Sequence, residues 1–229
     1  MPSMRYALVV AMAMALSTPL SRAAGTDPVL APPSEALPPL LGQARRELAD
    51  IVARRDLDAL LAHVGPDTKL SFGGDHGAED FRRIWGSGMH DQQDLWRELD
   101  AILALPGVVQ GTRDAPQYCA PYVFCLPTPG GIDPYEALVV TGTRVAIRDR
   151  PSRDGQVLTR VSHAVLQRAP DDPRDDGTTP PEWTRVRQAS GTTGFIASPW
   201  VRSPIDYRLM MSVEAGSGRW MLDYFIAGD

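Results

Sequence analysis

The sequence has no asparagine, a single lysine at position 69, two cysteines and few aromatic residues, only 7% of its 229 positions. Arginine therefore supplies 22 of the 23 basic side chains, a bias that we attribute to the codon usage of a GC-rich bacterial genome. Because 28 acidic residues give a net charge of −5, we expect no nucleic-acid partner. The 43% of apolar and 22% of charged residues are typical of a globular protein and argue against disorder, collagen and coiled coil.

The short motifs that identify common active sites are also missing. The chain contains no His-Glu-x-x-His, no Gly-x-Ser-x-Gly and no phosphate-binding glycine pattern. The proline-rich stretch 170–181 carries four aspartates, but their spacing does not follow the EF-hand order, so we favour a solvated loop over a calcium site. We therefore expect no cofactor, no metal site and no assigned catalytic residue.

The N-terminus has the layout of a secretory signal peptide, residues 1–23. Arg5 precedes an apolar stretch from Tyr6 to Leu16, and small residues follow, with Ser21 and Ala23 suited to cleavage. Eleven apolar residues are too few for a membrane-spanning helix, which needs about 20. The sequence therefore predicts a periplasmic or secreted protein without a transmembrane segment after cleavage, and removal of two arginines takes its net charge to −7.

Export changes the expectation for Cys119 and Cys125, because disulfides persist in oxidising compartments. Six positions of straight strand span roughly 20 Å, whereas a disulfide needs Cα atoms within about 7 Å. The two cysteines can pair only if the chain doubles back, and Pro121 between them makes a bend plausible. We favour a short-loop disulfide, with two buried thiols as the alternative.

Periodicity divides the remaining chain into a helical half and a β-rich half. Five prolines make 24–39 an extended leader, and order is expected only after it. Residues 40–136 have mainly helical spacing, with Asp56 and Asp91 as helix caps, Gly65-Pro66 as a helix stop and a brief strand at 70–72. Short alternating runs begin at Val108, and residues 204–229 predict a β-hairpin that needs cover from the helices.

Within the β-rich half, the stretch from Val139 to Ser152 resembles the opening of a bacterial SH3-like (SH3b) domain, with a strand, an arginine, a loop and a Pro-Ser pair. The later pieces follow in the family's order: 157–161, the Trp-initiated strand at 183–186 and the glycine turn with its closing strand at 191–196. The resemblance implies a small β-barrel over 137–203. Gly191 and Gly194 suit its sharp turns, and several apolar side chains can fill its interior: Val145, Ile147, Val157, Val186 and Ile196.

The rest of the chain is similar, more loosely, to exported SH3-like proteins of unknown function in Gram-negative bacteria, through the stretches 54–60, 72–74 and 218–229. Its initial helices and Trp-containing final hairpin are also similar to nuclear-transport-factor-2-like α+β folds, which would place the SH3-like barrel as an insertion. The expected fold class is therefore α+β, with an N-terminal helical region, a small SH3-like β-barrel at 137–203 and a β-hairpin packed on the N-terminal region.

Two functional hypotheses follow. The first is a non-enzymatic envelope protein whose SH3-like domain binds a peptide, a peptidoglycan fragment or an exported partner protein, with Arg148, Trp183, Phe195 and Trp200 as ligand-binding residues. Aromatic side chains of this kind can stack on a sugar or a peptide.

The second hypothesis is a small hydrolase or isomerase with its pocket in the N-terminal region. It uses Asp75, His76 and Glu79 near a glycine-rich turn, with His63 and His90 as side chains that could approach.

Overall fold

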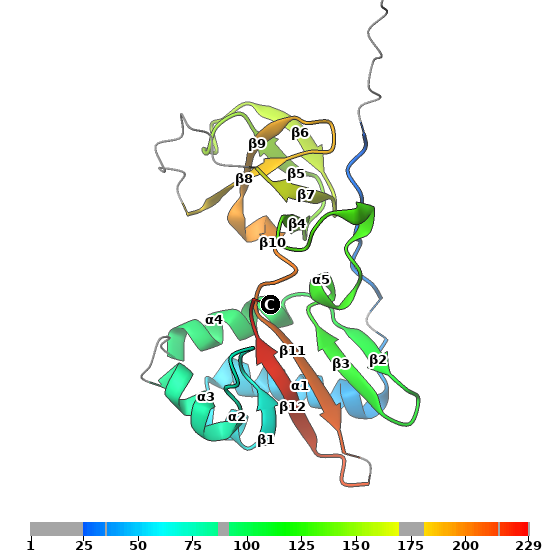
Figure 1. Cartoon of the computed structure of the whole chain (residues 1–229), viewed down its shortest axis with the longest axis vertical. Helices are drawn as coiled ribbons and strands as arrows, with labels where there is room; N and C mark the ends of the chain where they lie inside the picture. The colour runs from blue at the N-terminus through cyan, green and yellow to red at the C-terminus, as the bar shows by residue number, and fades with distance from the viewer. Residues whose placement is uncertain (1–24, 35, 87–91, 170–180, 215, 229) are drawn as a thin grey trace, which may run out of the picture.

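Two separate β-sheets, accompanied by helices, divide the chain into two lobes (Figure 1). The computed structural model describes residues 25–34, 36–86, 92–169, 181–214 and 216–228. Several sequence predictions lie outside these ranges: the signal peptide at 1–23, His90, the Asp91 cap and residues 170–180 of the acidic insert. Within the described ranges the fold is mixed α+β, with five α-helices and two sheets, and the strands dominate its C-terminal part.

The first lobe combines four helices with a five-stranded sheet. Its helices are α1 (Pro39–Arg54), α2 (Leu57–Leu61), α3 (Gly77–Gly86) and α4 (Gln92–Leu103). Its strands are β1 (Val64–Lys69), β2 (Val108–Gly111), β3 (Pro116–Ala120), β11 (Arg208–Val213) and β12 (Trp220–Ile226), in the order β1-β12-β11-β3-β2. Only the β1–β12 pair is parallel. The C-terminal hairpin thus lies inside the sheet, with β3 on one side and β1 on the other.

Local sequence explains the helix boundaries. The apolar side of α1 is buried, and the helix ends where Arg55 adopts a left-handed φ of 54°. The Asp56 carboxylate accepts a hydrogen bond from the Ala59 backbone at 3.0 Å, as the predicted cap of α2 should. The predicted strand at 70–72 is wrong, because β1 runs over 64–69 and includes Gly65-Pro66. Pro66 is tolerated there because β1 is an edge strand and need not donate on both sides.

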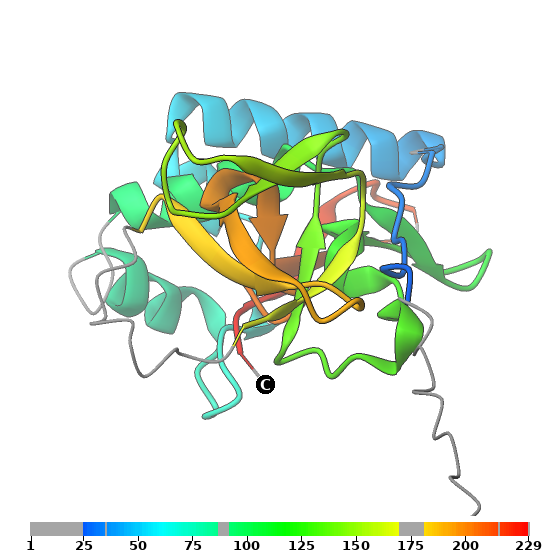
Figure 2. The same cartoon turned by 90° about the horizontal axis from the view of Figure 1, so that it is seen from above.

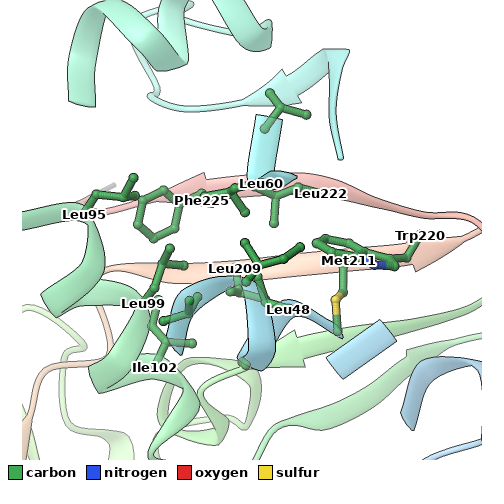
Figure 3. Packing of buried hydrophobic residues seen from close by; sticks show 14 of the residues in the cluster. Leu48, Leu60, Leu95, Leu99, Ile102, Leu209, Met211, Trp220, Leu222 and Phe225 are labelled. Atoms are coloured by element: carbon green, nitrogen blue, oxygen red, sulfur yellow. The ribbon is translucent and has the colours of Figure 1, made fainter. Parts of the chain in front are cut away.

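The helices cover one face of the five-stranded sheet and bury a continuous apolar core (Figure 3). Leu48, Leu60, Leu95 and Leu99 from the helices meet Leu209, Met211, Trp220, Leu222 and Phe225 from the hairpin.

Side chains of β12 are expected to alternate between the two faces of the sheet, but this alternation fails at one point. A bulge between Leu222 and Tyr224 shifts the register, so Phe225 enters the core and Tyr224 does not.

The second lobe, residues 137–202, is one antiparallel seven-stranded sheet of order β10-β4-β7-β8-β9-β5-β6. Its strands and the short η2 helix are β4 (Ala137–Val140), β5 (Val145–Arg148), β6 (Val157–Val161), β7 (Val165–Arg168), β8 (Trp183–Arg187), β9 (Thr193–Ala197), η2 (Ser198–Trp200) and β10 (Val201–Arg202). Among the described residues, end strands β10 and β6 do not pair, so the predicted closed barrel is not observed.

The inner side of this sheet has its own apolar cluster, which includes four of the five predicted interior residues: Val145, Ile147, Val186 and Ile196. Val157 is only half-buried and lies outside the cluster. Gly191 has the expected positive φ of 87°, but Gly194 does not. Gly194 is needed for close packing instead, because a Cβ there would lie 2.6 Å from Ile147 Cγ2.

The predicted leader is ordered where it touches the second lobe, contrary to expectation. Val29 pairs with Ala164, the Leu30 amide donates to the His163 carbonyl at 2.9 Å, and the Val165 amide donates to the Pro28 carbonyl at 2.7 Å. The Asp27 carboxylate accepts from the Ala189 amide at 2.6 Å. We call residues 27–30 the N-terminal strap; from it the chain descends to α1 in the first lobe (Figure 1).

A third apolar cluster joins the strap to both lobes. Leu30 packs with Tyr122 and Val123 of the short helix α5 (Tyr122–Cys125) and with Val139 and Val165 of the second sheet. Figure 2 shows the second lobe lying over the first when the molecule is seen from above.

A disulfide joins Cys119 at the end of β3 to Cys125, with Cα atoms 5.9 Å apart, because the chain doubles back at Pro121. Across the described residues, every helix is too short or too polar to cross a membrane.

Candidate functional site

A recess of about 400 Å³ lies on the second lobe and gathers two tryptophans and four arginines. We call it the Trp–Arg pocket. Its walls come from β5, the turn before it, the β5–β6 loop, β6, β8, β9 and η2: Thr143, Arg144, Val145, Ala146, Arg148, Arg153, Arg160, Trp183, Ala197 and Trp200. This volume is within the range of small-molecule sites in proteins.

Strand parity brings these side chains to one face. Val145 and Ile147 point into the lobe's core, so Ala146 and Arg148 point outward. Arg160 lies directly opposite Ala146 in the neighbouring strand β6. Directly paired residues share a face, so β5 and β6 together present two arginines beside a small alanine.

The same rule places the first tryptophan. Trp183 at the start of β8 pairs with Ala197 at the end of β9, and both line the pocket. A small residue opposite the indole leaves one side of the ring open to the recess.

Trp200 is fixed by several contacts although its side chain is 50% exposed. Its carbonyl accepts a hydrogen bond from the Thr141 amide at 2.9 Å, and Ser198 of the same short helix lies 2.8 Å from the Thr184 hydroxyl. Its ring packs against Gly142, where a Cβ would lie only 2.7 Å from Trp200 Cε3. Glycine at 142 thus allows this exposed aromatic ring to lie flat on the lobe.

The four arginines make few bonds within the protein. Arg148 donates to the Gly155 carbonyl at 2.6 Å and Arg160 donates to the Arg144 carbonyl at 3.0 Å. A guanidinium has five N–H donors, so most remain available after one such bond. In the described part of the chain, no carboxylate forms an ion pair with Arg144, Arg148, Arg153 or Arg160. The part of the pocket that the structure describes is therefore cationic, although the protein as a whole is acidic.

Three of the four predicted ligand-binding residues line this pocket: Arg148, Trp183 and Trp200. Phe195 does not line it, although it is the cross-strand partner of Arg148. Arg148 also braces the β5–β6 loop, because its guanidinium donates to the Gly155 carbonyl at 2.6 Å.

Sequence reasoning missed Arg144, Arg153 and Arg160. The alternation of 157–161 could have indicated that Arg160 points outward, because Val157 and Val161 are apolar and Arg160 falls on the opposite side of the strand from them. The pairing of β5 with β6, which brings Arg160 beside Arg148, was not readable from either strand alone.

A second recess, of about 450 Å³, lies in the first lobe and contains two of the residues proposed for catalysis, Asp75 and His76. The Asp75 carboxylate accepts hydrogen bonds from the Ser71 hydroxyl and from Arg83, each at 2.6 Å. These bonds lower the pKa of Asp75 below its ordinary value. The His76 ring instead lies 2.8 Å from the Gly74 carbonyl through Nδ1.

The remaining proposed side chains do not complete a catalytic arrangement. Glu79 does not line this recess, and His63 lies elsewhere, stacked on Trp220 with ring centroids 3.6 Å apart. A carboxylate orients a histidine base by accepting its N–H, and within the described residues Asp75 has no such bond with His76. Nor does the described structure contain a group of three His, Cys, Asp or Glu side chains suited to a metal ion.

Comparisons with known proteins add little. No protein-family model matches the sequence, and no curated protein matches it. Among solved structures, the chain is similar to a designed NTF2-like protein at 10% identity and a TM-score of 0.30, over 82% of this chain and 96% of that one. A similarity at this level carries no argument about fold or function.

Proposed function

We propose that this chain is an exported, non-enzymatic envelope protein that binds a peptide, a peptidoglycan fragment or a partner protein through its second lobe. The observation that carries the proposal is the Trp–Arg pocket. Arg148, Trp183 and Trp200 are 52 positions apart at their extremes in the sequence, yet they line one recess. Exposed aromatic rings beside charged donors are typical of recognition surfaces.

The proposal includes an SH3-like classification of residues 137–203. Two features support it: the strands are short and antiparallel, and they enclose a small apolar cluster contributed by β4, β5, β7, β8 and β9. The β5 and β9 strands also pair through Arg148 and Phe195, which joins the β5–β6 hairpin to the rest of the sheet. Export rests on the signal-peptide pattern in residues 1–23.

The second recess supports the hydrolase or isomerase alternative less well. Its carboxylate is held by Ser71 and Arg83, so it is not positioned to orient the imidazole of His76. We therefore place the function in the second lobe.

Cosedimentation with purified sacculi tests the cell-wall form of the proposal. The protein lacking residues 1–23 should pellet with sacculi at low salt, and the Trp183→Ala/Trp200→Ala double variant should remain in the supernatant. Stacking of a nucleic-acid base on an aromatic side chain contributes on the order of 1–3 kcal/mol per base, and a contact of similar size lost at two rings should be readily measured.

A matched control is Phe72→Ala, which removes a 58% exposed aromatic side chain of the first lobe. It should pellet like the parent protein. If the parent remains wholly in the supernatant, the cell-wall form is wrong. If both variants lose binding equally, the pocket is not the binding site.

A further inference from the structure

We infer that the Trp–Arg pocket recognises an acidic glycan, a chain of sugar rings that bear carboxylate groups. This inference rests on the proposed binding function and names its ligand class. It combines three observations on the pocket: its unbalanced positive charge, its two indole rings and the pairing of its strand backbones.

The charge of the pocket calls for an anionic ligand. The chain as a whole has a net charge of −5, but four arginines line this recess, and among the residues that the structure describes no aspartate or glutamate lines it. Such a concentration of like charge costs free energy in the free protein unless an anion offsets it. A guanidinium matches a carboxylate in a planar, bidentate pair, which is stronger than a neutral hydrogen bond.

The aromatic residues call for flat apolar surfaces on the same ligand. Trp183 and Trp200 are the large apolar side chains of the recess, and the other apolar lining residues are Val145, Ala146 and Ala197. Val145 is itself only 9% exposed, so among the described lining residues the two indole rings supply most of the apolar contact surface. An amphipathic indole packs well against the C–H face of a sugar ring.

The backbone argues against an extended peptide. A peptide commonly binds by adding a strand to a free sheet edge. Here β5 is paired with β6 and β9, while β8 is paired with β7 and β9. Among the described residues that line the pocket, only Arg160 lies on an end strand of the sheet, β6. The ligand must therefore be held mainly by side chains, as a glycan can be.

Isothermal titration of the protein lacking residues 1–23 tests the inference, with a galacturonate oligomer as the probe. Its methyl ester of the same length retains the rings but loses the charges. We expect the acid to bind at least about tenfold more tightly than the ester, equivalent to 1.4 kcal/mol. Added salt should weaken the acid's binding, because screening shortens the range of charge attraction.

Variants assign the effect to the pocket. The Arg153→Gln/Arg160→Gln double variant should lose about tenfold or more in affinity for the acid. The matched control is Arg46→Gln, which removes a positive charge from the exposed side of α1 and should bind like the parent.

Three results would overturn the inference. Equal binding of acid and ester shows that charge is not recognised. Tighter binding of a glutamate-rich peptide of equal charge makes the pocket a peptide site. Absence of binding by all three probes excludes the acidic glycan, whereas the sacculus experiment still decides the proposed function independently.

Discussion

At the scale of single residues, Tyr122 is a buried polar group at the junction of the lobes. Its side chain is fully buried, and among the described residues its hydroxyl has no hydrogen-bond partner. Burial also raises the pKa of the phenol. Removing an unsatisfied hydroxyl while keeping the ring should be neutral or stabilising, so Tyr122→Phe is expected to raise the free energy of unfolding by up to about 1 kcal/mol.

Tyr118→Phe is the matched control, because the Tyr118 hydroxyl accepts a hydrogen bond from Arg45 at 3.0 Å. Its loss should cost about 1 kcal/mol. Urea denaturation of both variants measures the two free energies. A Tyr122→Phe variant that loses as much stability as Tyr118→Phe would contradict this account.

Asp223 should make stability depend on pH. Burial raises the pKa of its carboxyl above the ordinary value of 3.8, although hydrogen bonds from Ser212 and Gln117 partly oppose the rise. The folded protein therefore holds this proton more tightly than the unfolded chain, and ionisation reduces stability as pH rises from 3.8 through the raised pKa.

Asp223→Asn removes that ionisation. Relative to the parent, the variant should gain stability progressively as pH rises through this interval. Denaturation midpoints measured across the interval test the prediction. A stability difference between the two proteins that is the same at every pH would refute it.

Residue-level sequence reasoning succeeded where the chemistry is local. Asp56 caps a helix because its carboxylate reaches an amide three residues ahead. It failed for Tyr224, since the bulge that turns this side chain away depends on pairing with β11.

At the scale of elements, the N-terminal strap is held on the second sheet by long-range contacts. Leu30 is only 8% exposed and packs on Tyr122, Val123 and Val139. Leu30→Ala is expected to cost about 2–4 kcal/mol, because it opens a cavity in that cluster. Neighbouring Val29, 59% exposed, provides the control: Val29→Ala should change stability little. Equal losses in thermal denaturation would mean that the strap does not contribute through this contact.

The strap and β1 show why elements were mispredicted. Proline-rich sequence favours extended backbone, and residues 27–30 are extended, but their hydrogen bonds go to residues 163–165, which lie more than 130 positions away. Likewise, Gly65-Pro66 ends a helix locally, yet β12 makes the same residues part of an edge strand. Long-range pairing decided both cases.

At the scale of the whole molecule, the two lobes should unfold together. The third apolar cluster contains residues of the strap, α5, β4 and β7, so neither lobe can open without exposing it. Differential scanning calorimetry should give one transition with equal calorimetric and van't Hoff enthalpies. Two resolved transitions would show that the lobes are energetically independent.

The pocket was predictable only in part at this scale. Arg148, Trp183 and Trp200 were found because each begins or ends a recognisable strand or turn. The cationic character of the pocket could not be predicted, because the net charge is the sum over all side chains and hides a local excess. Arg144, Arg153 and Arg160 become neighbours only when the sheet has folded, and an acidic chain can therefore carry a basic site.

The position of β12 has a consequence for synthesis. Residues 220–226 form the strand that β1 and β11 both pair with, so the helices of the first lobe have no complete sheet to cover until these residues have left the ribosome. A nascent chain that already contains every helix would still expose the apolar stripes of α1 and α4. Such a chain stays open to chaperones until β12 has been made.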